Sequence, residues 1–258
     1  MKIEFSTKQL RVLCATIVGL DLLFMLANWP PLVNSLLMPD PRSSLAPMLD
    51  MIRKQLDLKS EVDLATWYSS VILLMCGAVA LLNSGVRFVE GKSRWVYRAG
   101  WWLIAALLIA LSADEEAQIH ESLAPMLNRL SRTNPQRWVR EGAGDWVPLL
   151  TPFIAGSALL MIAFLGTVFW RHKKLLLLAM LGVACWVGAI YFESIESGAV
   201  GVQMSRDLEG FFEESCEIVG TTCLLFAFTS FFRKRQSLTE SLRAGDDGET
   251  VTPQTQQV

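Results

Sequence analysis

Carboxylate side chains gather in three short stretches, residues 114–121, 193–196 and 213–217, each of which follows or precedes an apolar segment. Residues 114–121 and 193–217 together contain eleven acids and one Lys or Arg, Arg206. Carboxylates crowded in an apolar setting need protons, basic partners or cations to offset their repulsion. The three stretches are therefore where chemistry is expected.

The spacing of these acids would aim pairs of them at one point if the stretches are helical. Glu193 and Glu196 are three residues apart, as are Glu214 and Glu217, and residues at this spacing share a helix face. Carboxylates with one imidazole suit Zn, Fe or Mn, whereas oxygen ligands alone suit Ca or Mg. We therefore predict a divalent metal site. Its candidate ligands are Asp114, Glu115, His120, Glu121, Glu193, Glu196, Glu214 and Glu217.

A metal at this site would activate water for attack on a lipid or lipid-linked substrate, with a spare glutamate as general base. Two alternatives stay open. The acids could carry protons or other cations across a membrane, or they could form a non-catalytic rim paired with the arginines of the following loop. Those arginines are Arg129, Arg132, Arg137 and Arg140.

The composition indicates a membrane protein. Of the 258 residues, 52% are hydrophobic and 19% charged, and the mean hydropathy is +0.36. The apolar residues form runs of roughly 15 to 24, the length that crosses a bilayer. This pattern excludes a soluble globular enzyme. The formal net charge of −2 offers no positive field for nucleic acid, and membrane lipids are the expected partners.

The apolar runs predict an all-α, polytopic six-helix transmembrane bundle. Pro30 ends the first run, because proline cannot continue a helix. The polar tail, residues 236–258, is predicted to be disordered. The six spans are expected at about 11–29, 64–83, 99–121, 147–170, 174–195 and 210–232.

Two of the spans are too short without their acids. The uninterrupted apolar part of the third, residues 101–113, would measure only about 20 Å as a helix. We expect this helix to continue through residue 121, since no glycine or proline intervenes. The sixth span, apolar over residues 218–232, must likewise extend back through residues 211–217.

Basic residues predict the orientation. Lys and Arg precede the first span, fill the two short connections around residues 87–98 and 171–174, and follow the sixth span. The positive-inside rule then places both termini in the cytoplasm, with a cell inner membrane the expected location, and all three acidic stretches on the opposite side. Amphipathic segments at 45–54 and 123–130 are predicted to be either interfacial helices in the extracytoplasmic loops or solvated loop helices packed on the bundle.

Other residues carry narrower expectations. Asp21 lies near the middle of the first span, where a lone acid needs a partner: either a structural hydrogen bond or a role in proton transfer. An interfacial belt is expected of the aromatic residues near span ends. These are Trp67, Tyr68, Trp101, Trp102, Trp146 and Trp170.

Two motifs carry a resemblance to a known group. The octet reads Asp-Glu-x4-His-Glu from Asp114, and the third stretch reads Glu-Glu-x2-Glu-x2-Gly from Glu213 to Gly220. Together with residues 57–69, they are similar to an uncharacterised family of bacterial polytopic membrane proteins. The resemblance implies a membrane bundle and no particular activity.

Overall fold

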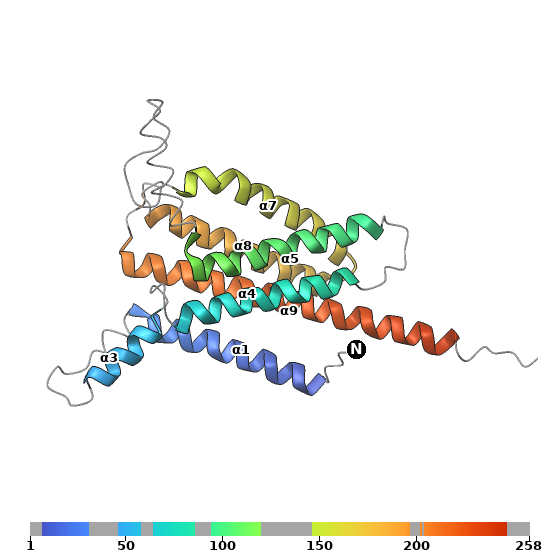
Figure 1. Ribbon diagram of the computed structural model, residues 1–258, viewed down its shortest axis with the longest axis horizontal. Helices are drawn as coiled ribbons and strands as arrows, with labels where there is room; N and C mark the ends of the chain where they lie inside the picture. Colours follow the sequence, from blue (N-terminus) through green and yellow to red (C-terminus); the bar gives the residue numbers. More distant parts are fainter. Residues whose placement is uncertain are drawn as a thin grey trace, which may run out of the picture.

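The computed structural model describes residues 7–30, 46–57, 64–85, 94–119, 146–196, 202 and 204–246, and within them the chain is helical, without strands (Figure 1). The helices are α1 (Thr7–Asn28), α3 (Ala46–Gln55), α4 (Leu64–Gly85), α5 (Arg94–Ala117), α7 (Trp146–Phe169), α8 (Lys173–Glu196) and α9 (Arg206–Asp246).

Six of these helices, all except α3, are long and apolar enough to cross a membrane. Each is at least 22 residues long, so each spans the roughly 30 Å hydrocarbon layer. The six helices alternate in direction, and the start of α1 and the end of α9 lie at the same end of the bundle (Figure 1). The protein is therefore a multi-pass membrane protein.

The spans pack as two closely associated pairs. The most extensive contacts join α8 to α9 and α4 to α5, and the next join α4 to α9, which connects the pairs. Helix α7 packs on α8, and α1 lies along α9 (Figure 1). Helix α3 is tied to the end of α1, because Asn28 Nδ2 donates a hydrogen bond to the carbonyl of Leu56 at 2.6 Å.

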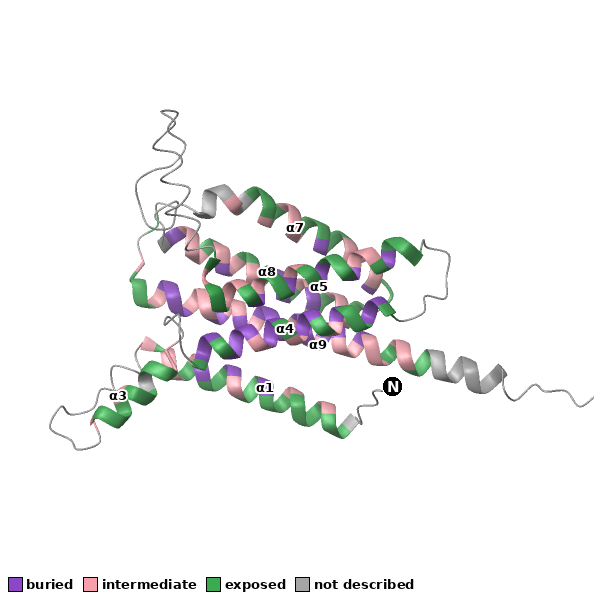
Figure 2. Ribbon diagram, viewed as in Figure 1, coloured by how far each residue is buried: buried purple, intermediate pink, exposed green. Residues whose placement is uncertain are grey.

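Burial follows this arrangement. Buried residues concentrate along α4 and α9, whereas α1 and α7 expose much of their surface (Figure 2). Large apolar side chains such as Leu22, Phe153 and Leu177 face outward. A bilayer accommodates such side chains without cost, and outward apolar faces on nearly every span are what a membrane bundle requires.

Trp101 is the centre of an aromatic core at the end of the bundle remote from the acids. It is completely buried, and its ring centroid lies 5.0 Å from that of Phe228 and 5.6 Å from that of Phe164. Tyr68 is also buried. These two residues therefore do not belong to an interfacial belt as predicted, because they face the helix contacts, whereas Trp67, Trp102 and Trp170 are more than half exposed.

Two predicted boundaries differ from the structure. Helix α5 ends at Ala117 instead of continuing through residue 121. It is still long enough to cross a bilayer, because it begins at Arg94, earlier than predicted. Gln118 adopts a positive φ of 50°, which takes the backbone out of the helix. At the other terminus, α9 continues to Asp246, so the structure describes residues 236–246 as helical, while the disorder of the tail stays a prediction. No proline or glycine occurs between residues 236 and 244 to end the helix.

The predicted helix at 45–54 exists as α3, while its position at a membrane interface remains a prediction. The second predicted interfacial segment, residues 123–130, lies outside the described residues, as does the tail beyond residue 246.

Candidate metal centre

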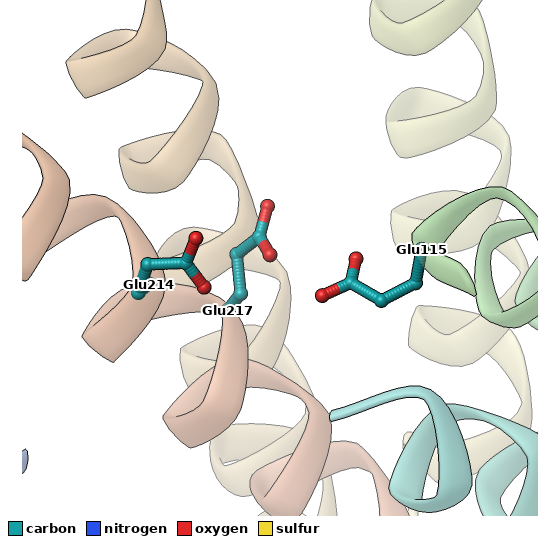
Figure 3. Close-up of side chains that lie close together, drawn as sticks. All are labelled: Glu115, Glu214 and Glu217. Atoms are coloured by element: carbon teal, nitrogen blue, oxygen red, sulfur yellow. The ribbon is translucent and has the colours of Figure 1, made fainter. Parts of the chain in front are cut away.

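Three carboxylates converge from two spans. Glu115 comes from the last turn of α5, and Glu214 and Glu217 come from α9. Each offers a carboxylate oxygen, and the three oxygens lie within 4.8 Å of one another. The side chain of Glu115 reaches across toward those of Glu214 and Glu217 (Figure 3). All three residues are partly buried.

The helical structure of α9 explains why this helix supplies two of the three converging carboxylates. Glu214 and Glu217 are three residues apart in a continuous helix, so both point to the same side. Glu115 lies in the last turn of α5, which closes with a hydrogen bond from the backbone N–H of Gln118 to the carbonyl of Asp114 at 2.7 Å. Asp114 and Glu115 therefore occupy the carboxyl-terminal turn of α5.

A second pair of carboxyls adjoins these three. Glu213 on α9 lies beside Glu193 on α8, and Glu217 interacts electrostatically with Glu193 and Asp114 as well as with Glu115. Acids from α5, α8 and α9 thus form one cluster: Asp114, Glu115, Glu193, Glu213, Glu214 and Glu217.

Close contact between α8 and α9 brings Glu193 to Glu213. A Cβ atom added to Gly182 would lie 2.8 Å from the carbonyl oxygen of Gly220, and one added to Gly220 would lie 2.9 Å from that of Gly182. Side chains at these positions would hold the backbones apart, so the glycines permit the helices to touch within one turn of Glu217.

The eight predicted ligands have different outcomes. Glu115, Glu214 and Glu217 are brought together, with Asp114 and Glu193 beside them. His120 and Glu121 lie outside the described residues, so the imidazole ligand stays a prediction. Glu196 ends α8, but its side chain is likewise not described. Glu213 was missed as a site residue, although its spacing of four residues from Glu217 placed it on the same helix face.

Asp21 forms a separate polar group deeper in the bundle. Tyr68 on α4 donates its hydroxyl to Asp21 Oδ1 at 2.5 Å, and Thr222 on α9 lies beside the same carboxyl. Thr222 is five residues beyond Glu217, about 7.5 Å farther along the helix axis. Asp21 therefore has the hydrogen-bonded partner expected from the sequence, and it lies closer to the middle of the bundle than the acidic cluster does.

No curated protein and no solved structure matches this chain. A family model described as a domain of unknown function (DUF8692) does match it, over residues 14–232. The match includes the second to fifth spans, most of the first and sixth, and all three acidic stretches. The chain therefore belongs to the DUF8692 family.

Proposed function

We propose that this membrane protein binds a divalent cation between α5 and α9 and uses it to act on a lipid or lipid-linked substrate. The convergence of Glu115, Glu214 and Glu217 carries this proposal. Two oxygens on opposite sides of an ion bound at about 2.4 Å are about 4.8 Å apart. The observed oxygen separations of up to 4.8 Å therefore suit a common ion with no more than side-chain adjustment.

The helix ends give independent support. Asp114 and Glu115 lie in the last turn of α5, and Glu193 lies near the end of α8. The carboxyl-terminal end of a helix carries a partial negative charge, so an acid there costs roughly 0.3–1 kcal/mol, whereas a cation is favoured. A bound cation would offset both this cost and the repulsion among the acids.

The ligand chemistry narrows the choice of metal. The three converging ligands are all carboxylates, which suit Mg, Ca and Mn. If His120 joins them as predicted, Zn, Fe and Mn become suitable. Mn²⁺ is compatible with both sets, so it is the best probe for a binding experiment.

The position of the cluster suggests the class of substrate. The acids of α5 and α8 lie at the ends of their helices, and those of α9 lie seven to eleven residues after its start. The cluster is therefore toward one end of the bundle, where we expect lipid headgroups. A divalent cation there would polarise a phosphoryl or carbonyl group and activate water. The neighbouring carboxyls of Glu213 and Glu193 lie next to the ligands and would accept or return a proton during the reaction.

Metal analysis tests the proposal directly. We expect purified wild-type protein to retain a divalent metal, and stripped protein to bind Mn²⁺ with a change in its electron paramagnetic resonance spectrum. The double variant E115Q/E217Q should bind Mn²⁺ at least about tenfold more weakly, since it loses two charged ligands. Glu116→Gln is the matched control, because this neighbouring acid is exposed and outside the cluster.

Wild-type protein that contains no metal and binds none of Mn²⁺, Zn²⁺, Fe²⁺, Mg²⁺ or Ca²⁺ would exclude the proposal. Equal Mn²⁺ affinity in wild type and E115Q/E217Q would exclude this site. His120→Ala, in the same titration, determines whether the imidazole contributes.

One observation favours proton or cation transport as a second candidate. The Asp21–Tyr68 pair continues the polar groups from the acidic cluster toward the middle of the bundle. If this is a pathway, liposomes containing the metal-free protein should show a flux that Glu217→Gln and Asp21→Asn each abolish. A flux that neither substitution changes would count against it.

A further inference from the structure

At the end of α5 opposite the acids, the first turns of the helix line a cavity of about 510 Å³. The described residues that line it are Arg94, Trp95, Arg98, Ala99 and Trp102. Arg94 and Arg98 are one helical turn apart, so their guanidinium groups share one side of the helix. Trp95, Ala99 and Trp102 follow one another at helical spacing along an adjacent face.

We propose that this cavity binds the phosphate-bearing headgroup of an anionic phospholipid. Arginine presents several N–H donors in a planar arrangement that matches phosphate oxygens, and two arginines one turn apart offer two such groups. Tryptophan side chains are enriched at membrane interfaces, where one edge meets the headgroups and the rest meets hydrocarbon. The cavity is within the range of roughly 300–1,000 Å³ that is typical of small-molecule sites.

One wall of the cavity is held in place by α4. The indole Nε1 of Trp102 donates a hydrogen bond to Ser84 Oγ at 2.9 Å, and this hydroxyl donates to the carbonyl of Leu81 at 2.7 Å. The end of α4 therefore orients the Trp102 ring, so this wall exists before any ligand binds. A site ordered in advance loses less entropy on binding.

The surrounding surface favours a lipid over free phosphate. Trp95 is 76% exposed, and Val96 and Leu103 are 64% and 58% exposed. These side chains extend an apolar surface from the arginines along a helix that spans the membrane, which is where acyl chains attached to a bound headgroup would lie. A free phosphate ion would make no use of this surface.

The proposed lipid site is independent of the metal centre, because the two occupy opposite ends of α5. It also agrees with the predicted orientation, in which this end faces the cytoplasm. The inner leaflet supplies anionic lipids to basic clusters at that level.

Native mass spectrometry of the full-length, delipidated protein tests the proposal. The probes are phosphatidylglycerol, phosphatidylcholine and inorganic phosphate, each titrated separately. We expect the wild type to retain phosphatidylglycerol in preference to phosphatidylcholine, and R94Q/R98Q to lose about tenfold or more in affinity for phosphatidylglycerol alone. The matched control is K8Q/R11Q, which removes two exposed positive charges from the same end of the bundle but outside the cavity.

Three results would overturn the proposal. The first is equal retention of the two lipids by the wild type. The second is an equal loss of phosphatidylglycerol affinity in R94Q/R98Q and K8Q/R11Q, which would indicate a general effect of positive charge. The third is displacement of phosphatidylglycerol by inorganic phosphate at millimolar concentration, which would indicate a site for the free anion. Trp102→Phe gives a second measure that keeps both arginines: losing the bond to Ser84 should weaken phosphatidylglycerol binding while the protein remains folded.

Discussion

Glu115 at the end of α5 faces Glu217 on α9 across the boundary between the two most closely packed helix pairs, α4–α5 and α8–α9. A cation held by both residues joins the pairs, whereas two carboxylates facing each other without one push them apart. The same residues should therefore stabilise or destabilise the bundle according to whether metal is present.

Glu217→Gln should accordingly affect stability differently under two conditions. In chelator, the variant should be at least as stable as the wild type, because glutamine adds no charge to the cluster. With Mn²⁺ at about 100 times its dissociation constant, the wild type should gain about 2.7 kcal/mol that the variant does not. Thermal unfolding in detergent measures both. Glu116→Gln should follow the wild type, and an equal Mn²⁺ stabilisation of Glu217→Gln would contradict the prediction.

Gly182→Ala should separate α8 from α9. Its new Cβ would lie 2.8 Å from the carbonyl oxygen of Gly220, a backbone atom that cannot turn aside. Overpacking of this kind typically costs about 1–3 kcal/mol, so thermal stability should fall. Gly156→Ala is the matched control on α7, because a Cβ there meets nothing within 4 Å. Equal melting temperatures for the two variants would show that the helices do not touch at Gly182.

Tyr68→Phe should destabilise the bundle, because it removes the hydroxyl that donates to Asp21 and to the carbonyl of Ile17. Leaving a buried carboxyl short of a donor costs about 1–3 kcal/mol. Tyr191→Phe removes a hydroxyl from a residue that is 49% exposed and should have little effect. A double-mutant cycle with Asp21→Asn measures the coupling, and additive losses would mean that the two side chains do not interact.

Stability should also depend on pH through His172, in the turn between α7 and α8. Burial and the positive charges of Lys234 and Arg235 lower the pKa of His172 below its ordinary value of 6.5. The ring nitrogen Nδ1 accepts a hydrogen bond from Lys234 Nζ at 3.1 Å, which only the unprotonated nitrogen can do.

The unfolded chain therefore takes up this proton at a higher pH than the folded protein. The contribution of His172 to stability is complete above pH 6.5 and is lost as the pH falls from there through the folded-state pKa. Melting temperatures of wild type and His172→Gln, compared between pH 7.5 and 5, should show a steeper acid loss for the wild type. Identical slopes would exclude this role.

Much of the fold follows from local sequence. Leu64 begins α4 as predicted, and the predicted starts of α7 and α8 each differ from the structure by one residue. The ends of α5 and α9 were harder to predict from the sequence, because a helix end depends on one or two backbone angles. Nothing in the residues 114–121 marks Gln118 as the position where φ becomes positive.

The residues of the site were likewise only partly predictable from the sequence. The sequence predicted that acids from three spans lie at one end of the bundle, and it named Glu115, Glu214 and Glu217 among eight candidates. It did not distinguish these three from the others, and it omitted Glu213. Likewise it placed Trp101 at an interface, although the rotation of α5 directs this ring into the core.

By itself, then, the sequence determined the six long apolar helices found in the described part of the chain and the end of the bundle at which the acids collect. The thickness of the bilayer and the need to satisfy every backbone hydrogen bond act on contiguous residues, so a local pattern is enough. Only the tertiary structure decided which acids meet. That depends on the rotation of α5 and α9 and on the close contact at Gly182 and Gly220, and both are set by packing between residues far apart in the chain.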